Sequence, residues 1–155
     1  MVKKTILIFW TLFIAACNRE PVFQFDSIIH YTLRNEEEEE KQDSFSGLVY
    51  GENLPNTSVE EIEKDIDPIK WDKKLIPSEQ IKDISAVYTN KFYFDFTEQR
   101  CLPIYRDILV FKFKNKTTGI SKICFDCDIA ITVNNNRADI NVDQDEIKKL
   151  KTLIK

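Results

Sequence analysis

The sequence predicts an α+β domain: an antiparallel sheet of about five strands with two or three helices packed on one face. Several segments alternate apolar and polar residues, which is the period of a half-buried β-strand. Other segments begin with a capping residue and repeat apolar residues every three or four positions, as amphipathic helices do. The chain has 155 residues, with 11 phenylalanines and only three glycines. This composition is typical of one packed domain rather than a glycine-rich, low-complexity chain.

Three predicted strands lie before residue 100. In residues 22–33, Phe23 and Phe25 alternate with polar neighbours and are followed by a run of β-formers. Residues 45–50 form a shorter candidate strand. Residues 91–97 show the clearest alternation, with a phenylalanine at every second position. We expect that aromatic face to pack in the core, and a lipid- or ligand-binding surface is the alternative.

Two or three further strands are predicted after residue 100. Residues 108–114 and 120–125 alternate and form an antiparallel pair, joined by a hairpin loop of five residues, 115–119. Residues 128–133 continue either as a further strand or as a bend. The three asparagines at 134–136 then predict a turn.

A capping box predicts the first helix. The Ser58 hydroxyl can accept from the Glu61 amide while the Glu61 carboxylate reaches back to the Ser58 amide. The helix should run to about Lys64 and stop before Pro68, which restricts the residue preceding it. We expect Trp71 to pack this helix onto the core.

Two more helices follow from similar patterns. Ser78 is the expected N-cap of the second helix. Asp143 is the expected cap of the third, with Glu146 completing a capping box. The expected apolar faces are Ile81, Ile84 and Val87 or Tyr88 in the second helix, and Ile147, Leu150, Leu153 and Ile154 in the third.

The first seventeen residues have the layout of an export signal. Lys3 and Lys4 precede an apolar run over residues 6–16 that ends in two alanines and Cys17. This run is only about half of the roughly 20 residues that a membrane-spanning helix needs. The segment is therefore a poor membrane anchor and a good signal peptide.

The end of that segment, Ile14-Ala15-Ala16-Cys17, resembles the lipobox of bacterial lipoproteins, although leucine is commoner than isoleucine at its first position. The resemblance implies that residues 1–16 are a signal peptide and that Cys17 is the lipid attachment site, joined to diacylglycerol and then acylated, as with palmitate. Residues 17–21 would then be a tether and residues 22–155 a single globular domain. An ordinary secreted protein cut after Ala16 is the alternative.

The same resemblance implies an address in the bacterial cell envelope, tied to a membrane by lipid. Stable anchoring takes more than one acyl chain, which a fully modified lipoprotein cysteine supplies. By lipoprotein sorting rules, aspartate at residue 18 would favour the inner membrane, so Asn18 favours the outer membrane.

The charge excludes some partners. Removal of the signal peptide would take the formal charge from −4 to −6. An acidic surface argues against nucleic acid, which requires a basic patch. It also argues against electrostatic adhesion to anionic lipid.

Besides Cys17, the chain has three cysteines, and in an exported domain we expect two of them to form a disulfide. The favoured pairing joins Cys101 to either Cys124 or Cys127, closing a loop of about 25 residues that would stabilise the fold by about 3 kcal/mol. On a regular strand, Cys124 and Cys127 would point to opposite faces about 10 Å apart, so they could pair with each other only across a turn or bulge.

Two other uses of these cysteines stay open. The Cys124-Phe125-Asp126-Cys127 segment is a C-x-x-C that could be a thiol-redox site, but a β-rich run follows it where a redox site has a helix. Zinc could be bound by the three cysteines with His30 or an aspartate as the fourth ligand. His30 is the only histidine, and we expect it to be a half-buried structural residue.

Two acidic segments invite a cation-binding interpretation. Residues 36–40 are five consecutive glutamates, which repel one another and predict a solvated loop. The spacing of Asp139, Asn141 and Asp143 resembles the start of an EF-hand loop. The sixth position is Gln144 instead of glycine, and the twelfth is leucine instead of glutamate. A helix lead-in explains this segment better, and no metal is expected.

The sequence contains no nucleophile elbow, phosphate-binding loop, dinucleotide fingerprint or zinc-protease motif. We therefore expect a non-enzymatic binding or envelope-interaction module with structural cysteines, no cofactor and an envelope protein as its partner. A thiol-redox or zinc-dependent protein centred on Cys124 and Cys127 is the alternative.

Overall fold

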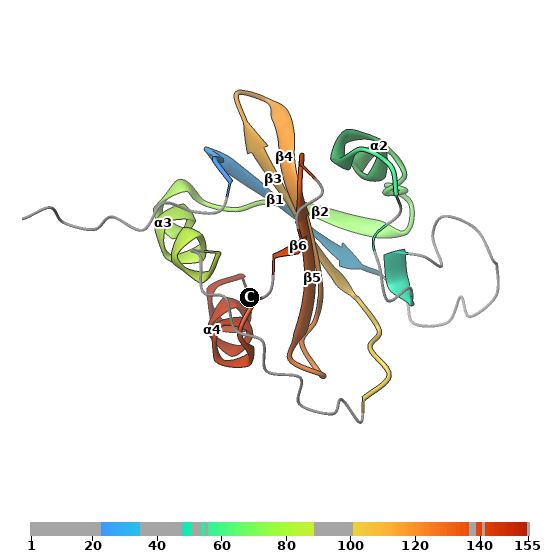
Figure 1. The fold of residues 1–155 in the computed structure, drawn as a ribbon. Coiled ribbons are helices and arrows are strands. Elements are labelled where there is room, and N and C mark those ends of the chain that lie inside the picture. Colours follow the sequence, from blue (N-terminus) through green and yellow to red (C-terminus); the bar gives the residue numbers. More distant parts are fainter. Residues whose placement is uncertain are drawn as a thin grey trace, which may run out of the picture.

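The structure, a computed structural model, contains a six-stranded antiparallel sheet with helices against both faces (Figure 1). It describes residues 23–34, 48–50, 54, 56–88, 101–136, 139–140 and 142–154. The predicted signal peptide and tether thus lie outside the described residues. The α+β class and the antiparallel sheet that the sequence predicts are confirmed.

The strands are arranged in the order β2-β1-β3-β4-β5-β6. Strands β3 to β6 form a meander, while β1 pairs with β2 on one side and with β3 on the other. The connection from β2 to β3 contains α3 and therefore passes over β1. The strands are β1 (Ser27–Leu33), β2 (Trp71–Leu75), β3 (Asp107–Phe113), β4 (Lys116–Cys124), β5 (Ile129–Asn134) and β6 (Asp139–Ile140); the helices are α2 (Val59–Lys64), α3 (Ser78–Val87) and α4 (Gln144–Ile154).

The sheet has an apolar core on each face. Helices α3 and α4 pack together on one face over a core that includes Leu109 and Phe111. Helix α2 covers the other face over Ile108 and Val110. Two or three helices on one face were expected; the structure has α3 and α4 on one face and α2 on the other, which was not expected. The sequence signal for it is the apolar run at residues 108–111, because a strand buried on both faces reads as continuous hydrophobic residues.

Helix α2 forms as its capping box predicts. The Glu61 amide donates to the Ser58 hydroxyl at 3.2 Å, and the Ser58 amide donates to Glu61 Oε2 at 3.1 Å. The helix ends at Lys64. Trp71 is buried in the same core as this helix, also as expected.

The second predicted cap is wrong, whereas Asp143 caps its helix as expected; the capping box predicted there with Glu146 stays a prediction. Pro77 occupies the N-cap of α3 and makes no side-chain capping bond, and Ser78 is the first helical residue. The fixed φ of proline orients the chain for helix entry in place of a hydroxyl bond. At α4, Asp143 Oδ1 accepts from the Asp145 amide at 2.8 Å, which is the capping role expected of Asp143.

The hairpin between β3 and β4 is tighter than the predicted five-residue loop. Only Lys114 and Asn115 form its turn, with φ angles of 50° and 64°. Two consecutive positive φ angles match the twist of the flanking strands, which is why two-residue hairpins use them. Residues 116–119, expected in the loop, belong to β4, and a bulge between Phe111 and Lys112 absorbs the shift in register.

Two other strand predictions have different outcomes, and one strand was not predicted. Leu48 and Val49 lie in a helical turn, so the strand predicted over residues 45–50 is wrong there. Residues 91–97 lie outside the described residues. Strand β2 was not predicted, because this edge strand exposes four of its five residues and shows no apolar alternation.

Candidate functional site

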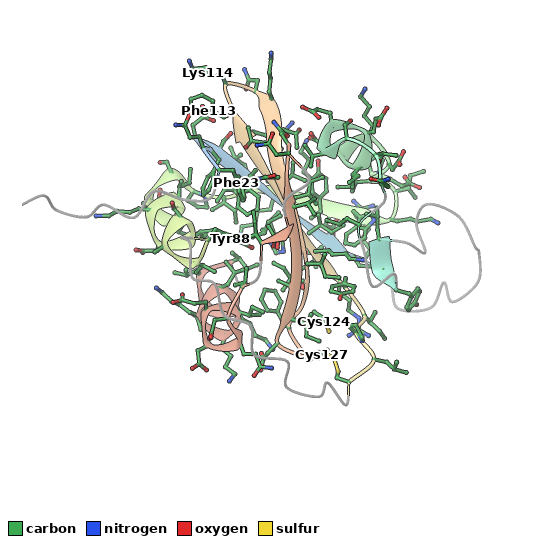
Figure 2. All side chains as sticks on the ribbon, viewed as in Figure 1. Phe23, Tyr88, Phe113, Lys114, Cys124 and Cys127 are labelled. Atoms are coloured by element: carbon green, nitrogen blue, oxygen red, sulfur yellow. A yellow bond between two sulfur atoms is a disulfide. The ribbon has the colours of Figure 1, made fainter. Side chains whose placement is uncertain are left out.

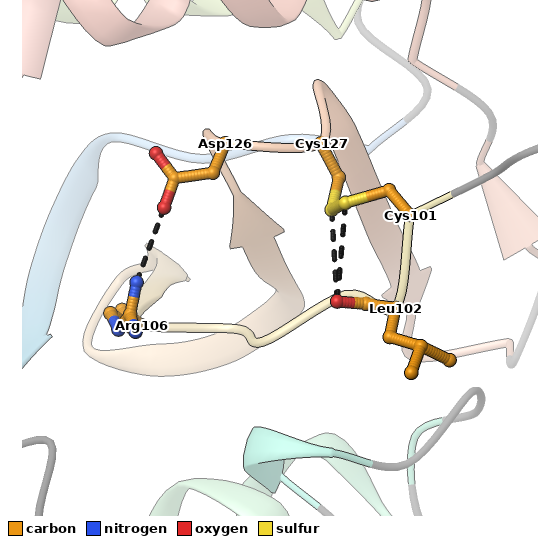
Figure 3. Close-up of a disulfide and its surroundings, with 5 residues drawn as sticks. All are labelled: Cys101, Leu102, Arg106, Asp126 and Cys127. Carbon is orange, nitrogen blue, oxygen red and sulfur yellow. Dashed lines mark hydrogen bonds and ion pairs between the residues drawn. A yellow bond between two sulfur atoms is a disulfide. The ribbon is translucent and has the colours of Figure 1, made fainter.

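The cysteines gather where β4 turns into β5. Cys101 and Cys127 form a disulfide with Cα atoms 5.9 Å apart, within the range that disulfides adopt (Figure 3). Of the two pairings that the sequence left open for Cys101, the structure contains the one with Cys127. The disulfide fastens the segment leading into β3 to the β4–β5 turn, and closing a loop of this length stabilises the fold by about 3 kcal/mol.

The shape of the β4–β5 turn decides which cysteine forms the disulfide with Cys101. Cys124 is the last residue of β4 and its side chain is buried, whereas residues 125–128 form the turn, in which Asp128 has a φ of 52°. Cys127 thereby leaves the strand and reaches Cys101. Cys124 stays behind as a free thiol.

The surroundings of the disulfide are polar and exposed. Arg106 donates to Asp126 Oδ2 at 3.2 Å beside it, which links the same two segments a second time. Both sulfur atoms lie 3.9 Å from the Leu102 carbonyl oxygen. Because oxidised sulfur carries no hydrogen, this approach is a contact and not a hydrogen bond. The Leu102 side chain is 93% exposed.

The proposed zinc ligands do not converge. Two of the three cysteines are joined to each other, and His30 Nε2 lies 2.7 Å from Asp107 Oδ1. By strand alternation, His30 and Cys124 face opposite sides of the sheet. Within the ranges that the structure describes, no group of three or more histidine, cysteine or acidic residues could hold a metal ion.

His30 is buried and paired across the sheet, as its expected structural role requires. The Thr32 hydroxyl lies 3.3 Å from the same ring nitrogen that faces Asp107. A catalytic relay needs the carboxylate on one ring nitrogen and the nucleophile on the other. This arrangement therefore orients the ring but does not activate the hydroxyl. The sequence offered no signal for Asp107 as the partner, because the two residues are 77 positions apart.

Sequence reasoning missed a buried lysine. Lys122 lies in β4 at 0% exposure, with its Nζ 4.4 Å from the centroid of the Tyr105 ring. Burial lowers the pKa of Lys122 to about 8. A lysine with a lowered pKa is what Schiff-base chemistry uses, but full burial keeps Lys122 from a substrate. Its sequence signal is that Ile120 and Cys124, which share its face of the strand, are both apolar.

Within the described residues, no part of the two acidic segments joins a group of side chains that could hold a metal ion. Asp143 caps α4, as the helix lead-in interpretation predicts. Asn141 and the glutamate run at residues 36–40 lie outside the described residues.

No known protein family, curated protein or solved structure matches this chain. None of the helices in the described part of the chain has the length and hydrophobicity required to cross a membrane.

Proposed function

We propose that this chain is an exported lipoprotein, anchored in the bacterial cell envelope through Cys17, whose domain acts by binding an envelope protein rather than by catalysis. The observation that carries the proposal is the Cys101–Cys127 disulfide. Disulfides form and persist in compartments outside the cytoplasm, where the lipobox would send the domain. The disulfide and the predicted export signal thus independently support a location outside the cytoplasm.

The placement of the reactive side chains supports binding over catalysis. A catalytic residue must reach its substrate. Cys124 and Lys122 are buried in the sheet, and His30 is both buried and paired. Each of these groups would need the core to open before it could act.

Fatty-acid labelling tests the anchoring. Cells expressing the full chain are grown with an alkyne analogue of palmitate, and the protein is purified and weighed by mass spectrometry. We expect label on the wild type, loss of residues 1–16 and no label on Cys17→Ala. The matched control, Cys124→Ala, should keep the label. An unlabelled wild-type protein that is still cut after Ala16 would favour the ordinary secreted alternative.

Crosslinking in the intact envelope tests the binding role. The anchored wild-type protein is crosslinked, purified and compared with Cys17→Ala made in the same cells. We expect one partner in fixed stoichiometry with the wild type, in reduced yield with the unanchored variant. Recovery of no partner, together with turnover of a thiol substrate that Cys124→Ala abolishes, would favour the thiol-redox alternative.

A further inference from the structure

We propose that the tip of the β3–β4 hairpin, residues 113–116, is the membrane-facing surface of the anchored domain and contacts the headgroups of anionic phospholipids. The proposal rests on the lipid attachment at Cys17 proposed above. It concerns one end of the sheet, whereas the disulfide and Cys124 lie at the opposite end (Figure 2).

Phe23 is the first residue that the structure describes. This side chain is buried, with its ring centroid 4.9 Å from that of Phe111 and 6.3 Å from that of Tyr88. Phe23 lies six positions after Cys17, a span that reaches at most about 20 Å when fully extended. That reach is shorter than the diameter of a domain with a radius of gyration of about 14 Å. The anchor therefore restricts the bilayer to the surface around Phe23.

The hairpin tip lies at this same end. Just after Phe23, the Asp26 amide donates to the Lys112 carbonyl at 2.8 Å, and Asp26 Oδ2 accepts from the Lys114 amide at 2.9 Å. The entering segment thus runs directly beside the turn. The hairpin extends beyond α2 and α3 at this end of the sheet (Figure 1), with Phe113 and Lys114 at its tip (Figure 2).

The tip has the chemistry of an interfacial contact. Lys114 and Lys116 are exposed, and Lys114 Nζ lies 5.1 Å from the centroid of the half-buried Phe113 ring. Lys112 is engaged by Glu63 at 2.7 Å, and Asp26 is the exposed carboxylate bonded to the turn. Exposed lysines next to an aromatic ring suit the boundary between phosphate headgroups and acyl chains. Because the chain as a whole is acidic, this basic tip would orient the domain.

Because the domain is tethered to the bilayer, a weak contact at the hairpin tip is enough to orient it. One lysine near an anionic surface shifts an equilibrium about fivefold, the equivalent of about 1 kcal/mol. Two lysines would not bind a free acidic domain firmly. A short tether, however, holds the tip at a high effective concentration next to the bilayer, so the same energy decides which surface faces the lipid.

Amide hydrogen exchange on the lipidated, full-length processed protein tests this orientation. The protein is reconstituted in vesicles of phosphatidylcholine alone or mixed with phosphatidylglycerol. We expect slower exchange at residues 113–116 in the mixed vesicles, with residues 124–128 unchanged. Each substitution, Lys114→Gln and Lys116→Gln, should reduce the bound population about fivefold relative to the free one. Lys73→Gln and Lys74→Gln, two exposed lysines on the edge strand β2, are the matched controls and should have no effect.

The outcomes separate this proposal from the proposed function. If mass spectrometry finds no lipid on Cys17, the anchoring itself fails. If the protein is lipidated but the hairpin exchanges equally on both kinds of vesicle, only the membrane-facing tip is refuted. Equal loss of protection in the β2 control variants would also refute it, since the effect would then reflect net charge rather than this surface.

Discussion

The ring of Phe23 occupies the space that a side chain at residue 119 would need. A Cβ atom on Gly119 would lie 2.7 Å from Cε2 of that ring, closer than nonbonded carbon atoms approach each other. The glycine in β4 thus lets the segment before β1 close over the aromatic core that includes Phe111. The packing of Phe23 therefore requires glycine at residue 119 of β4.

Gly119→Ala should therefore lower the free energy of unfolding by about 1–3 kcal/mol, the usual cost of overpacking. In a Phe23→Leu background the smaller side chain leaves room for the methyl group, so the cost of the same substitution should fall by at least about 0.5 kcal/mol. Urea unfolding of the four proteins in the double-mutant cycle measures this coupling. Equal costs in both backgrounds would show that the ring does not restrict residue 119.

A chain of buried hydroxyl groups makes the stability of the fold decrease at alkaline pH. Tyr88 donates to Ser121 Oγ at 3.0 Å, and Ser121 Oγ lies 2.7 Å from Thr132 Oγ1. Burial raises the pKa of Tyr88 far above its ordinary value of 10.0. The folded state keeps this proton while the unfolded state loses it, so the stability is full below pH 10 and falls as the pH rises above 10.

Tyr88→Phe should cost about 1 kcal/mol at neutral pH, since Ser121 keeps its bond to Thr132. The variant should also lose less stability than the wild type above pH 10. Ser121→Ala should cost more, about 1–3 kcal/mol, because it removes a buried hydroxyl that bonds both Tyr88 and Thr132. Denaturant unfolding across this pH range measures both effects. If the free energy of unfolding of Tyr88→Phe fell with pH as steeply as that of the wild type, Tyr88 would not be the cause of the alkaline loss of stability.

Lys122 makes the free energy of unfolding increase with pH, over a pH range just below the one in which Tyr88 makes it decrease. Its folded pKa of about 8 lies below the ordinary value of 10.5, so between these values the unfolded state binds the proton that the folded state has released. The free energy of unfolding should therefore rise from pH 8 to pH 10. This gain is lost when the pH falls through 8, because the lysine is then protonated in both states. Lys122→Met should remove this rise, whereas Lys74→Met, on the exposed strand β2, should preserve it. Urea midpoints measured at pH 7, 8, 9 and 10 would reveal the difference, and an unchanged slope in Lys122→Met would exclude this lysine as its cause.

The disulfide predicts a definite thiol count. The processed chain carrying Cys17→Ser should show one reactive thiol in denaturant and none when folded, since Cys124 is buried. Three thiols in denaturant would mean that no disulfide forms. Cys101→Ser and Cys127→Ser should each lower the unfolding free energy by about 3 kcal/mol and by similar amounts, because either change opens the same loop. Cys124→Ala serves as the matched control and should leave the disulfide intact.

Local signals explain which elements could be predicted. The Ser58 and Glu61 pair specifies its own helix start, because both hydrogen bonds lie within four residues. Ser78 resembles such a cap but follows a proline, which takes the capping position itself. The β2 edge strand has no local apolar pattern and is created by its pairing with β1, so sequence periodicity could not reveal it.

The sequence by itself determined the α+β class and the cap of α2, because both depend on residues close together in the chain. The proposed lipid anchor at Cys17 likewise rests on a local pattern, the four residues 14–17 and the apolar run before them. Only the tertiary structure decided which cysteine pairs with Cys101, which carboxylate meets His30 and that both faces of the sheet are covered. It also decided that the chain enters beside the lysines of the hairpin tip. These relationships join positions 25 to 90 residues apart, and which of them form depends on strand order and register, since a shift of one residue would turn every side chain of a strand to the opposite face.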